Sequence, residues 1–179
     1  MTGGLTGDLV RLRARIEADV PVLDTELHDD VAGDVRSSRR TWRPMSPGAQ
    51  ASMNRMAEPM DRAAPFSVVT VADDTLAGAA VLWDIDTHHR SAHIGLDLLP
   101  GFRGKGLGTD VVRVLCHYGF TVLGLHRIQI ETPTDNHAMI RVAERVGFRR
   151  EAVRRHAVWA MGEFLDDVIL GLLAGEWTP

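Results

Sequence analysis

Apolar and polar residues alternate along several short stretches of this chain, a pattern typical of strands with one buried face. In the stretch 8–13, Val10 and Leu12 lie on one side and Arg11 and Arg13 on the other. Further segments that are rich in β-branched and aromatic residues and bounded by turn residues also predict strands. These segments are 67–72, 77–83, 92–99, 127–132, 149–159 and 164–173. Short turns join the first three of them, which predicts an antiparallel meander.

Other segments place apolar residues at the spacing of an amphipathic helix. They are 16–31, 46–63, 109–123 and 136–146. Asn136 is suited to cap the last of these helices and Gly147 to end it, and the arginine-rich stretch 36–40 predicts a solvated loop between the first two. The order strand, two helices, three strands, helix, strand, helix, two strands predicts a mixed α/β sheet flanked by helices, in a single domain over residues 1–179.

The composition fits one globular domain and excludes several classes of protein. Of the 179 residues, 45% are hydrophobic, and the formal net charge of −4 makes neither nucleic acid nor an anionic membrane an expected partner. No apolar run approaches the roughly 20 residues of a membrane-spanning helix, and the segment 1–21 lacks a signal-peptide pattern. The single cysteine, Cys116, predicts an inert core thiol in a reducing compartment. We therefore expect a cytoplasmic protein.

A cluster of glycines lies between a predicted strand and a predicted helix, in the segment 98–109. Gly104, Gly106 and Gly108 remove side chains where the backbone turns into the helix, so several N–H groups can point outward at the positive end of the helix. Such a backbone is suited to bind a phosphate group. The cluster lacks the lysine and hydroxyl pair of a P-loop and the βαβ unit of a dinucleotide fingerprint. A tight turn without a ligand is the alternative.

The motif R-x-x-G-x-G at 103–108 resembles the Q/R-x-x-G-x-G/A signature of the GCN5-related N-acetyltransferases (GNAT). The segment 92–100 is similar to the fourth strand of this family, and 136–148 to its fourth helix and the entry of the next strand. The segments 162–166 and 176–177 resemble the end of the RimJ/RimL-like branch, which includes ribosomal-protein N-terminal acetyltransferases. The resemblance covers nearly the whole chain and agrees with the predicted order of elements.

The resemblance implies a GNAT-type fold, with a seven-stranded, mostly antiparallel sheet that splays between its fourth and fifth strands, here 92–99 and 127–132, and about four flanking helices. It also implies acetyl-CoA as co-substrate. In the family, the glycine loop binds the pyrophosphate, and unpaired backbone at the end of the fourth strand binds the pantetheine arm as an added strand would. The residues so implied in coenzyme binding are Leu98, Leu99, Pro100, Arg103, Gly104, Lys105, Gly106, Leu107, Gly108, Thr109 and Asn136.

Acyl transfer to an amine needs a base, because most amines are protonated near neutral pH. His93 is the first candidate, since it lies in the fourth strand, where many members of the family carry a glutamate base, and since imidazole titrates near neutral pH. Asp97 lies in phase with His93 and could orient it or replace it. Asp84, Asp86 and Glu131 lie at strand ends and are weaker candidates, which we expect to be solvated.

One position departs from the family's pattern. Related sequences commonly carry a serine three residues after the helix-opening asparagine, whereas this chain carries Met139, so the proton donor for the departing thiolate is unassigned. Tyr118 is the only tyrosine, and its place in the amphipathic pattern predicts a core residue. Trp42 either lines an acceptor groove or fastens its loop to the core.

Two functions stay open on the sequence alone. The first is N-acyl transfer, with acetyl or another acyl group such as succinyl, by direct attack in a ternary complex. Its acceptor is a primary amine of a protein N-terminus, an amino acid, a polyamine or another small molecule. The second is a module that binds coenzyme A without turnover. No metal site is expected, because His88, His89 and His93 lack further ligands at a recognised spacing, and a homodimer is compatible with the sequence.

Overall fold

A seven-stranded sheet forms the centre of the computed structural model, which describes residues 5–38, 41–46, 54–55 and 60–178. The strands lie in the order β1-β2-β3-β4-β5-β7-β6, and all neighbours are antiparallel except β4 and β5. The strands are β1 (Val10–Arg13), β2 (Ala63–Thr70), β3 (Leu76–Asp86), β4 (Ser91–Leu98), β5 (Arg127–Pro133), β6 (Arg149–Ala160) and β7 (Glu163–Leu173). The sheet therefore confirms the GNAT-type fold that the sequence resemblance implied.

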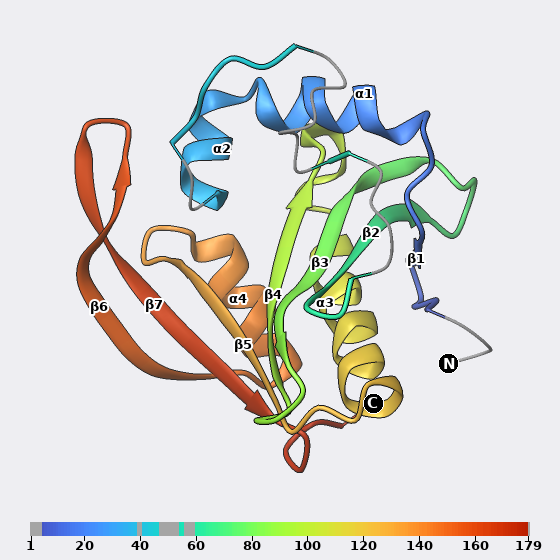
Figure 1. The fold of residues 1–179 in the computed structure, drawn as a ribbon, viewed down its shortest axis with the longest axis vertical. Coiled ribbons are helices and arrows are strands. Elements are labelled where there is room, and N and C mark those ends of the chain that lie inside the picture. The colour runs from blue at the N-terminus through green and yellow to red at the C-terminus, as the bar shows by residue number, and fades with distance from the viewer. Residues whose placement is uncertain (1–4, 39–40, 47–53, 56–59, 179) are drawn as a thin grey trace.

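The parallel strands β4 and β5 pair over only part of their length. Their register joins Ser91 to Arg127, Ala92 to Ile128 and His93 to Gln129, after which the two strands diverge. Figure 1 shows the sheet opening upward from this short contact, with β1–β4 on one side and β5, β7 and β6 on the other. We call the divergence beyond His93 and Gln129 the splay.

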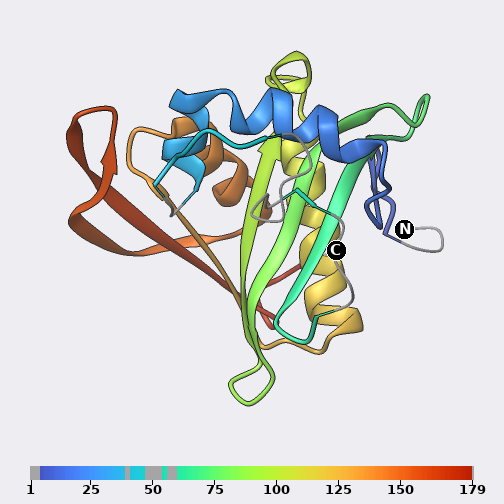
Figure 2. The ribbon, with the colours of Figure 1, turned by 45° about the horizontal axis from the view of Figure 1, so that its top comes forward.

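Helices lie behind the sheet and across its open end. The helical elements are α1 (Asp19–Leu23), η1 (Asp24–His28), α2 (Val31–Ser37), η2 (Pro100–Phe102), α3 (Leu107–His117), η3 (Tyr118–Val122) and α4 (His137–Val146). Helices α3 and α4 lie behind the sheet, whereas α1, η1 and α2 cross the end toward which β4 points (Figures 1 and 2). Burial follows the strand alternation: Ala92 and Ile94 of β4 are buried in the core on the helix-covered face, together with Val111 and Leu115 of α3.

The predicted caps of α4 and the burial of Cys116 are confirmed. The Asn136 side chain caps α4 by accepting a hydrogen bond from the Met139 amide, and Gly147 ends the helix in a left-handed conformation. Cys116 is fully buried, and this burial raises the pKa of its thiol, as expected of an inert core cysteine. No helix in the described ranges is long and apolar enough to cross a membrane.

The predictions for the N-terminal helices are wrong in part. The stretch 16–31 forms two elements, α1 and η1, and Asp30 then starts α2 by accepting a hydrogen bond from the Gly33 amide. Helix α2 reaches Ser37, so part of the stretch 36–40 is helical, because this cap restarts the helix closer to the arginines than the apolar spacing suggests. Most of the predicted helix 46–63 lies outside the described residues; 54–55 and 60–62 are not helical, and Ala63 begins β2.

Candidate functional site

The glycine cluster forms the connection from β4 to α3. Gly104 and Gly106 have φ angles of +76° and +85°, in the left-handed region that a residue with a Cβ rarely adopts. Gly106 is the N-cap of the eleven-residue helix α3 and offers no side chain to the helix end. The first-turn amides of α3 therefore face the loop, and the positive end of the helix dipole lies there. This geometry is suited to a phosphate group.

Gly108 has a different reason to be small. A Cβ at this position would lie 3.5–3.9 Å from side chains of Val142, Leu96 and Leu98, which is ordinary van der Waals distance. A methyl group therefore fits, whereas a larger side chain meets α4 and the end of β4. This spacing agrees with the G/A alternative at the last position of the family motif.

A buried carboxylate that the sequence did not single out fixes the start of α3. Asp110 is 6% exposed and accepts hydrogen bonds from the backbone amides of Asp8, Leu9 and Val10. These contacts bind the segment that leads into β1 to the first turn of α3, across 100–102 residues of sequence. A lone aspartate in a helix gives no local signal of such a contact.

Arg103 contacts the end of β4. Its Nε donates to the Leu98 carbonyl at 2.9 Å, and one of its terminal nitrogens lies 3.8 Å from Asp30, the N-cap of α2. Lys105 lies over the Phe102 ring, with its Nζ 5.6 Å from the ring centroid. The proposed phosphate contact of Arg103 therefore competes with two contacts within the protein.

The backbone of β4 presents an unpaired strand edge to the splay. The Leu99 amide donates to the Ala77 carbonyl at 2.9 Å, which directs the odd-numbered residues of β4 to β3 for hydrogen bonding. The backbone groups of Ile94, Leu96 and Leu98 then point to the opposite side, where pairing with β5 has ended. The Leu98 carbonyl confirms this direction, because it accepts from Arg103 rather than from β3. Backbone of this kind can bind an extended chain.

His93 lies where β4 and β5 separate. Its ring is 4.5 Å from that of Trp83, centroid to centroid, and its buried Nδ1 lies 3.3 Å from Oε1 of Glu131 on β5. The side chain of Glu131 is 8% exposed, whereas that of His93 is 21% exposed. The expectation that Glu131 is a solvated residue at a strand end is therefore wrong. Glu131 lies two residues beyond Gln129 on β5, so the two side chains share a face of the strand, and on that face Glu131 contacts His93.

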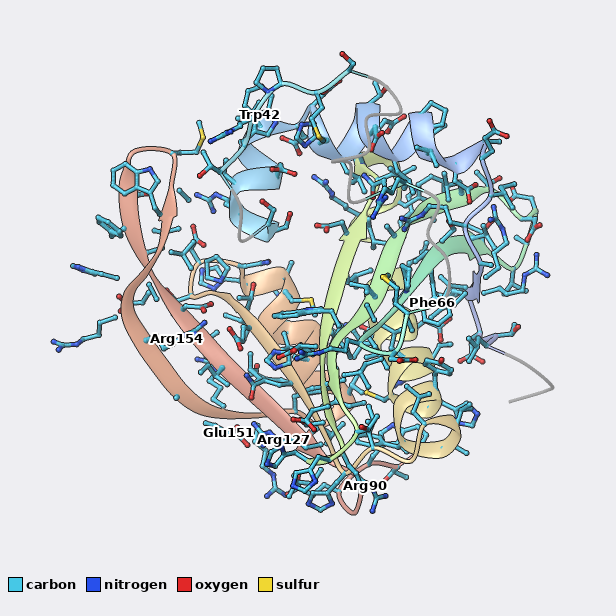
Figure 3. All side chains as sticks on the ribbon, viewed as in Figure 1. Trp42, Phe66, Arg90, Arg127, Glu151 and Arg154 are labelled. Carbon is cyan, nitrogen blue, oxygen red and sulfur yellow. The ribbon has the colours of Figure 1, made fainter. Side chains whose placement is uncertain are left out.

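Glu131 belongs to a set of side chains that we call the polar chain: His93, Gln129, Glu131, Arg154 and Asp167. Gln129 donates to Oε1 of Glu131 at 2.7 Å, and Arg154 donates to Oε2. The same nitrogen of Arg154 also contacts Asp167, which is 1% exposed and lies on β7. Figure 3 shows Arg154 on this half of the sheet, with the Arg127–Glu151 ion pair nearer the strand starts. The polar chain thus draws on β4, β5, β6 and β7.

Asp97 makes its contacts elsewhere. Burial raises the pKa of this carboxyl group and the charge of Asp34 raises it further, against a hydrogen bond from Ser37 and the charge of Arg103. The carboxylate placed beside His93 is that of Glu131, and the catalytic role of Asp97 stays a prediction.

Helix α2 spans the open end of the splay. Ser37 binds Asp97 on β4, Asp30 lies near Arg103, and Arg36 pairs with Asp135 in the loop after β5. Both edges of the splay are therefore linked by polar contacts to the same short helix.

The other candidate carboxylates lie outside this arrangement. Asp84 pairs with Arg62 at the surface, and the exposed Asp86 accepts hydrogen bonds from the amides of His89 and His88. These backbone hydrogen bonds, with one from the His89 side chain, lower the pKa of Asp86 to about 2. Both residues are solvated, as predicted.

The remaining predicted residues have defined contacts. Asn136 accepts from the Met139 amide at 3.2 Å and donates to Thr132 Oγ1 at 2.9 Å, so its contact with the coenzyme stays a prediction. Tyr118 packs edge to face with Phe66 in the core, as expected. Trp42 donates to the His28 carbonyl at 2.8 Å and stacks on its ring, which fastens its loop to η1.

Comparison with known proteins agrees with this geometry. A family model described as acetyltransferase (GNAT) domain matches residues 10–149. The uncharacterized N-acetyltransferase p20 of Bacillus licheniformis is 31% identical over 113 residues, which are 63% of this chain and 64% of that protein. The putative ribosomal N-acetyltransferase YdaF of Bacillus subtilis (strain 168) is 35% identical over 105 residues, or 59% of this chain and 57% of that protein. The matched part of the chain thus spans 57–64% of the length of these relatives.

A solved structure supports the fold over a longer stretch. Spermidine N-acetyltransferase from Vibrio cholerae, determined in complex with CoA and spermine, superposes with a TM-score of 0.76. The superposition covers 93% of this chain and 96% of that chain, at 20% sequence identity. At this identity the likeness concerns the fold.

Proposed function

This chain belongs to the GNAT acetyltransferase domain family, and from this premise we propose that it transfers an acyl group from acyl-CoA to a primary amine. The acyl group is acetyl, as in the names of the relatives. Transfer is direct, with both substrates bound together. The observation that carries the proposal is the end of β4–β5 pairing at His93 and Gln129, which leaves the rest of β4 unpaired on the side facing β5 up to the segment that leads into the glycine loop.

The residues of this chain fit coenzyme A. The left-handed glycines and the uncapped start of α3 suit the anionic pyrophosphate, because amide groups and the helix dipole favour negative charge there. The edge of β4 at Ile94, Leu96 and Leu98 suits the pantetheine arm, which carries amide groups of its own. When bound, the coenzyme supplies a thioester whose carbonyl carbon can be attacked.

His93 acts as the base in this proposal. The amine nitrogen forms a C–N bond with the acyl carbon, the C–S bond breaks with its electron pair left on sulfur, and the amine proton passes to Nε2 of His93. Nδ1 faces Glu131, so Nε2 is the ring nitrogen available to the amine. With Met139 at the position of the usual serine, solvent protonates the thiolate, which is a good leaving group because a thiol has a pKa of ~8.5.

The charges around the splay favour a cationic acceptor. Burial raises the pKa of the Asp97 carboxyl and the nearby charge of Asp34 raises it further, partly offset by Ser37 and Arg103, so an additional positive charge at this end of the splay stabilises both carboxylates. A polyamine or a peptide with a free N-terminus has that charge, and the similar proteins include acetyltransferases named for spermidine and for a ribosomal substrate. An acidic acceptor is disfavoured.

The test combines turnover with binding. Thiol release from acetyl-CoA is measured with a panel of polyamines, amino acids and peptides with free or acetylated N-termini, and succinyl-CoA is run in parallel. We expect release only with free amines, and calorimetric binding of coenzyme A. Binding without turnover across the panel would favour a non-catalytic coenzyme A module, and no binding would remove the proposal.

A further inference from the structure

We propose that Glu131 is the positioning residue for His93, and that Arg154, fixed by Asp167, holds Glu131 in place. This inference deepens the proposed function and rests on it, because it gives His93 a partner that sets which ring nitrogen meets the amine. No signal in the sequence points to this set, whose members lie on four strands and are up to 74 residues apart in sequence.

The geometry of Glu131 leaves it little freedom. Its Oε1 receives the Gln129 amide at 2.7 Å and faces His93 Nδ1 at 3.3 Å, while its Oε2 receives Arg154. A carboxylate bound on both oxygens cannot rotate without losing a hydrogen bond. In this proposal Nδ1 carries the proton that faces Glu131, which leaves the lone pair on Nε2.

Arg154 explains why a carboxylate can be buried here. Glu131 and Asp167 are 8% and 2% exposed at their side chains, and both contact the Arg154 guanidinium. The two carboxylates carry one negative charge more than Arg154. A proton on His93 neutralises that excess, so the polar chain stabilises the imidazolium that forms when the amine gives up its proton.

Charged groups reach His93 from several elements. Glu131 on β5, Arg154 on β6 and Asp167 on β7 form the chain itself, and Asp97 lies four residues along β4, with Asp34 of α2 near it. Trp83 on β3 packs against the ring at a tilted angle but does not titrate. Removing Glu131 therefore removes the negative charge that directly contacts His93.

The experiment compares two variants with expected shifts of opposite sign. Glu131→Gln should lower kcat/KM roughly 10–100-fold and move the acidic limb of its pH profile to lower pH, because the imidazolium loses its partner. Arg154→Gln should move that limb to higher pH, because two carboxylates lose their counter-charge. Glu131→Asp should restore the position of the acidic limb in part. None of the three variants should change the KM for acetyl-CoA. Glu144→Gln, which breaks a Glu–Arg pair at the surface, is the matched control.

A titration without turnover separates this inference from the proposed function. The His93 ring is followed by NMR as pH is varied, with its signal assigned by loss in His93→Gln, in the wild type and in both charge variants. The proposal is supported if the titration midpoint of His93 shifts in opposite directions in Glu131→Gln and Arg154→Gln, and if the acidic limb of kcat/KM shifts in the same direction as the midpoint in each variant. An unchanged midpoint in Glu131→Gln, or a limb that stays in place at normal kcat/KM, overturns it. Shifted midpoints in a protein that acetylates no amine overturn the proposed function and leave the pairing intact.

Discussion

The glycine loop at 103–109 and the polar chain around His93 border the same splay but are built in different ways. The loop offers backbone amides and left-handed φ angles within one continuous segment, which follows β4 and the short element η2. The polar chain offers side chains from four strands, joined by hydrogen bonds and ion pairs.

This difference predicts different sensitivities. A backbone site tolerates most side-chain changes but not a residue that cannot adopt its φ angles. A site made of side chains is sensitive to each member, because every removed partner leaves a buried charge uncompensated. Glycine substitutions in the loop should therefore weaken coenzyme binding, whereas charge substitutions in the polar chain should lower turnover.

The largest effect is expected on the side of the polar chain. His93→Ala should lower kcat/KM by roughly 10²–10⁴ near neutral pH, the range for loss of a general base, while coenzyme A binds as before. The defect should shrink as pH rises, because more of the amine is then free. His89→Ala, an exposed histidine paired with Asp86, is the control. Near-normal turnover of His93→Ala at pH 7 would transfer the role of base to Asp97 or to water.

The next effect concerns the loop. Gly106→Val should weaken coenzyme A binding roughly a hundredfold in calorimetry, because a β-branched residue is strained at φ of +85° and the first-turn amides of α3 must shift. Gly101→Val is the matched control, since its Cβ would meet no atom within 4 Å and its φ is not left-handed. Equal affinity in the two variants would contradict the assignment of the loop.

A smaller effect is expected for the arginine of the loop. Arg103→Ala should weaken coenzyme A binding only about tenfold. A charge-assisted contact contributes ~1.5–3 kcal/mol, and part of this is offset because Arg103 must give up its contacts with Leu98 and Asp30 to reach the phosphate. Pantetheine, which lacks the pyrophosphate, should bind equally to the variant and the wild type. Weaker binding of pantetheine to the variant would show that Arg103 shapes the end of β4 instead.

The smallest effect on the glycine loop or the polar chain is expected from Asp19, a buried carboxylate that belongs to neither. Burial opposes ionisation of Asp19, but hydrogen bonds from Arg13, the Ile16 amide and Ser67 outweigh it and lower its pKa from 3.8 to about 2. The ionised form thus stabilises the fold fully above pH ~4, and about 2 kcal/mol of that stability is lost as pH falls through about 2. Urea unfolding of the wild type and of Asp19→Asn at pH 6 and pH 2.5 isolates this contribution, because the variant should lose less stability than the wild type between the two pH values. The pH profile of turnover in Asp19→Asn should keep the wild-type acidic limb, unlike the profile of Glu131→Gln.

The sequence predicted most of the elements along the chain and the glycine loop because their signals are local. Alternation, helical spacing and the caps at Asn136 and Gly147 each depend on residues within one element. The predictions for the N-terminal helices were wrong because a single cap, Asp30, restarts a helix that the apolar spacing would have continued.

By itself, the sequence determined the strands, the helices α3 and α4, the loop that precedes α3 and the family to which the chain belongs. Only the tertiary structure decided that Glu131, expected in solvent, lies beside His93, that Arg154 and Asp167 support it, and that Asp97 turns to α2. The reason is physical. Which side chains meet across a sheet depends on register and twist, and the pairing of β4 with β5 ends where long-range packing makes the strands diverge.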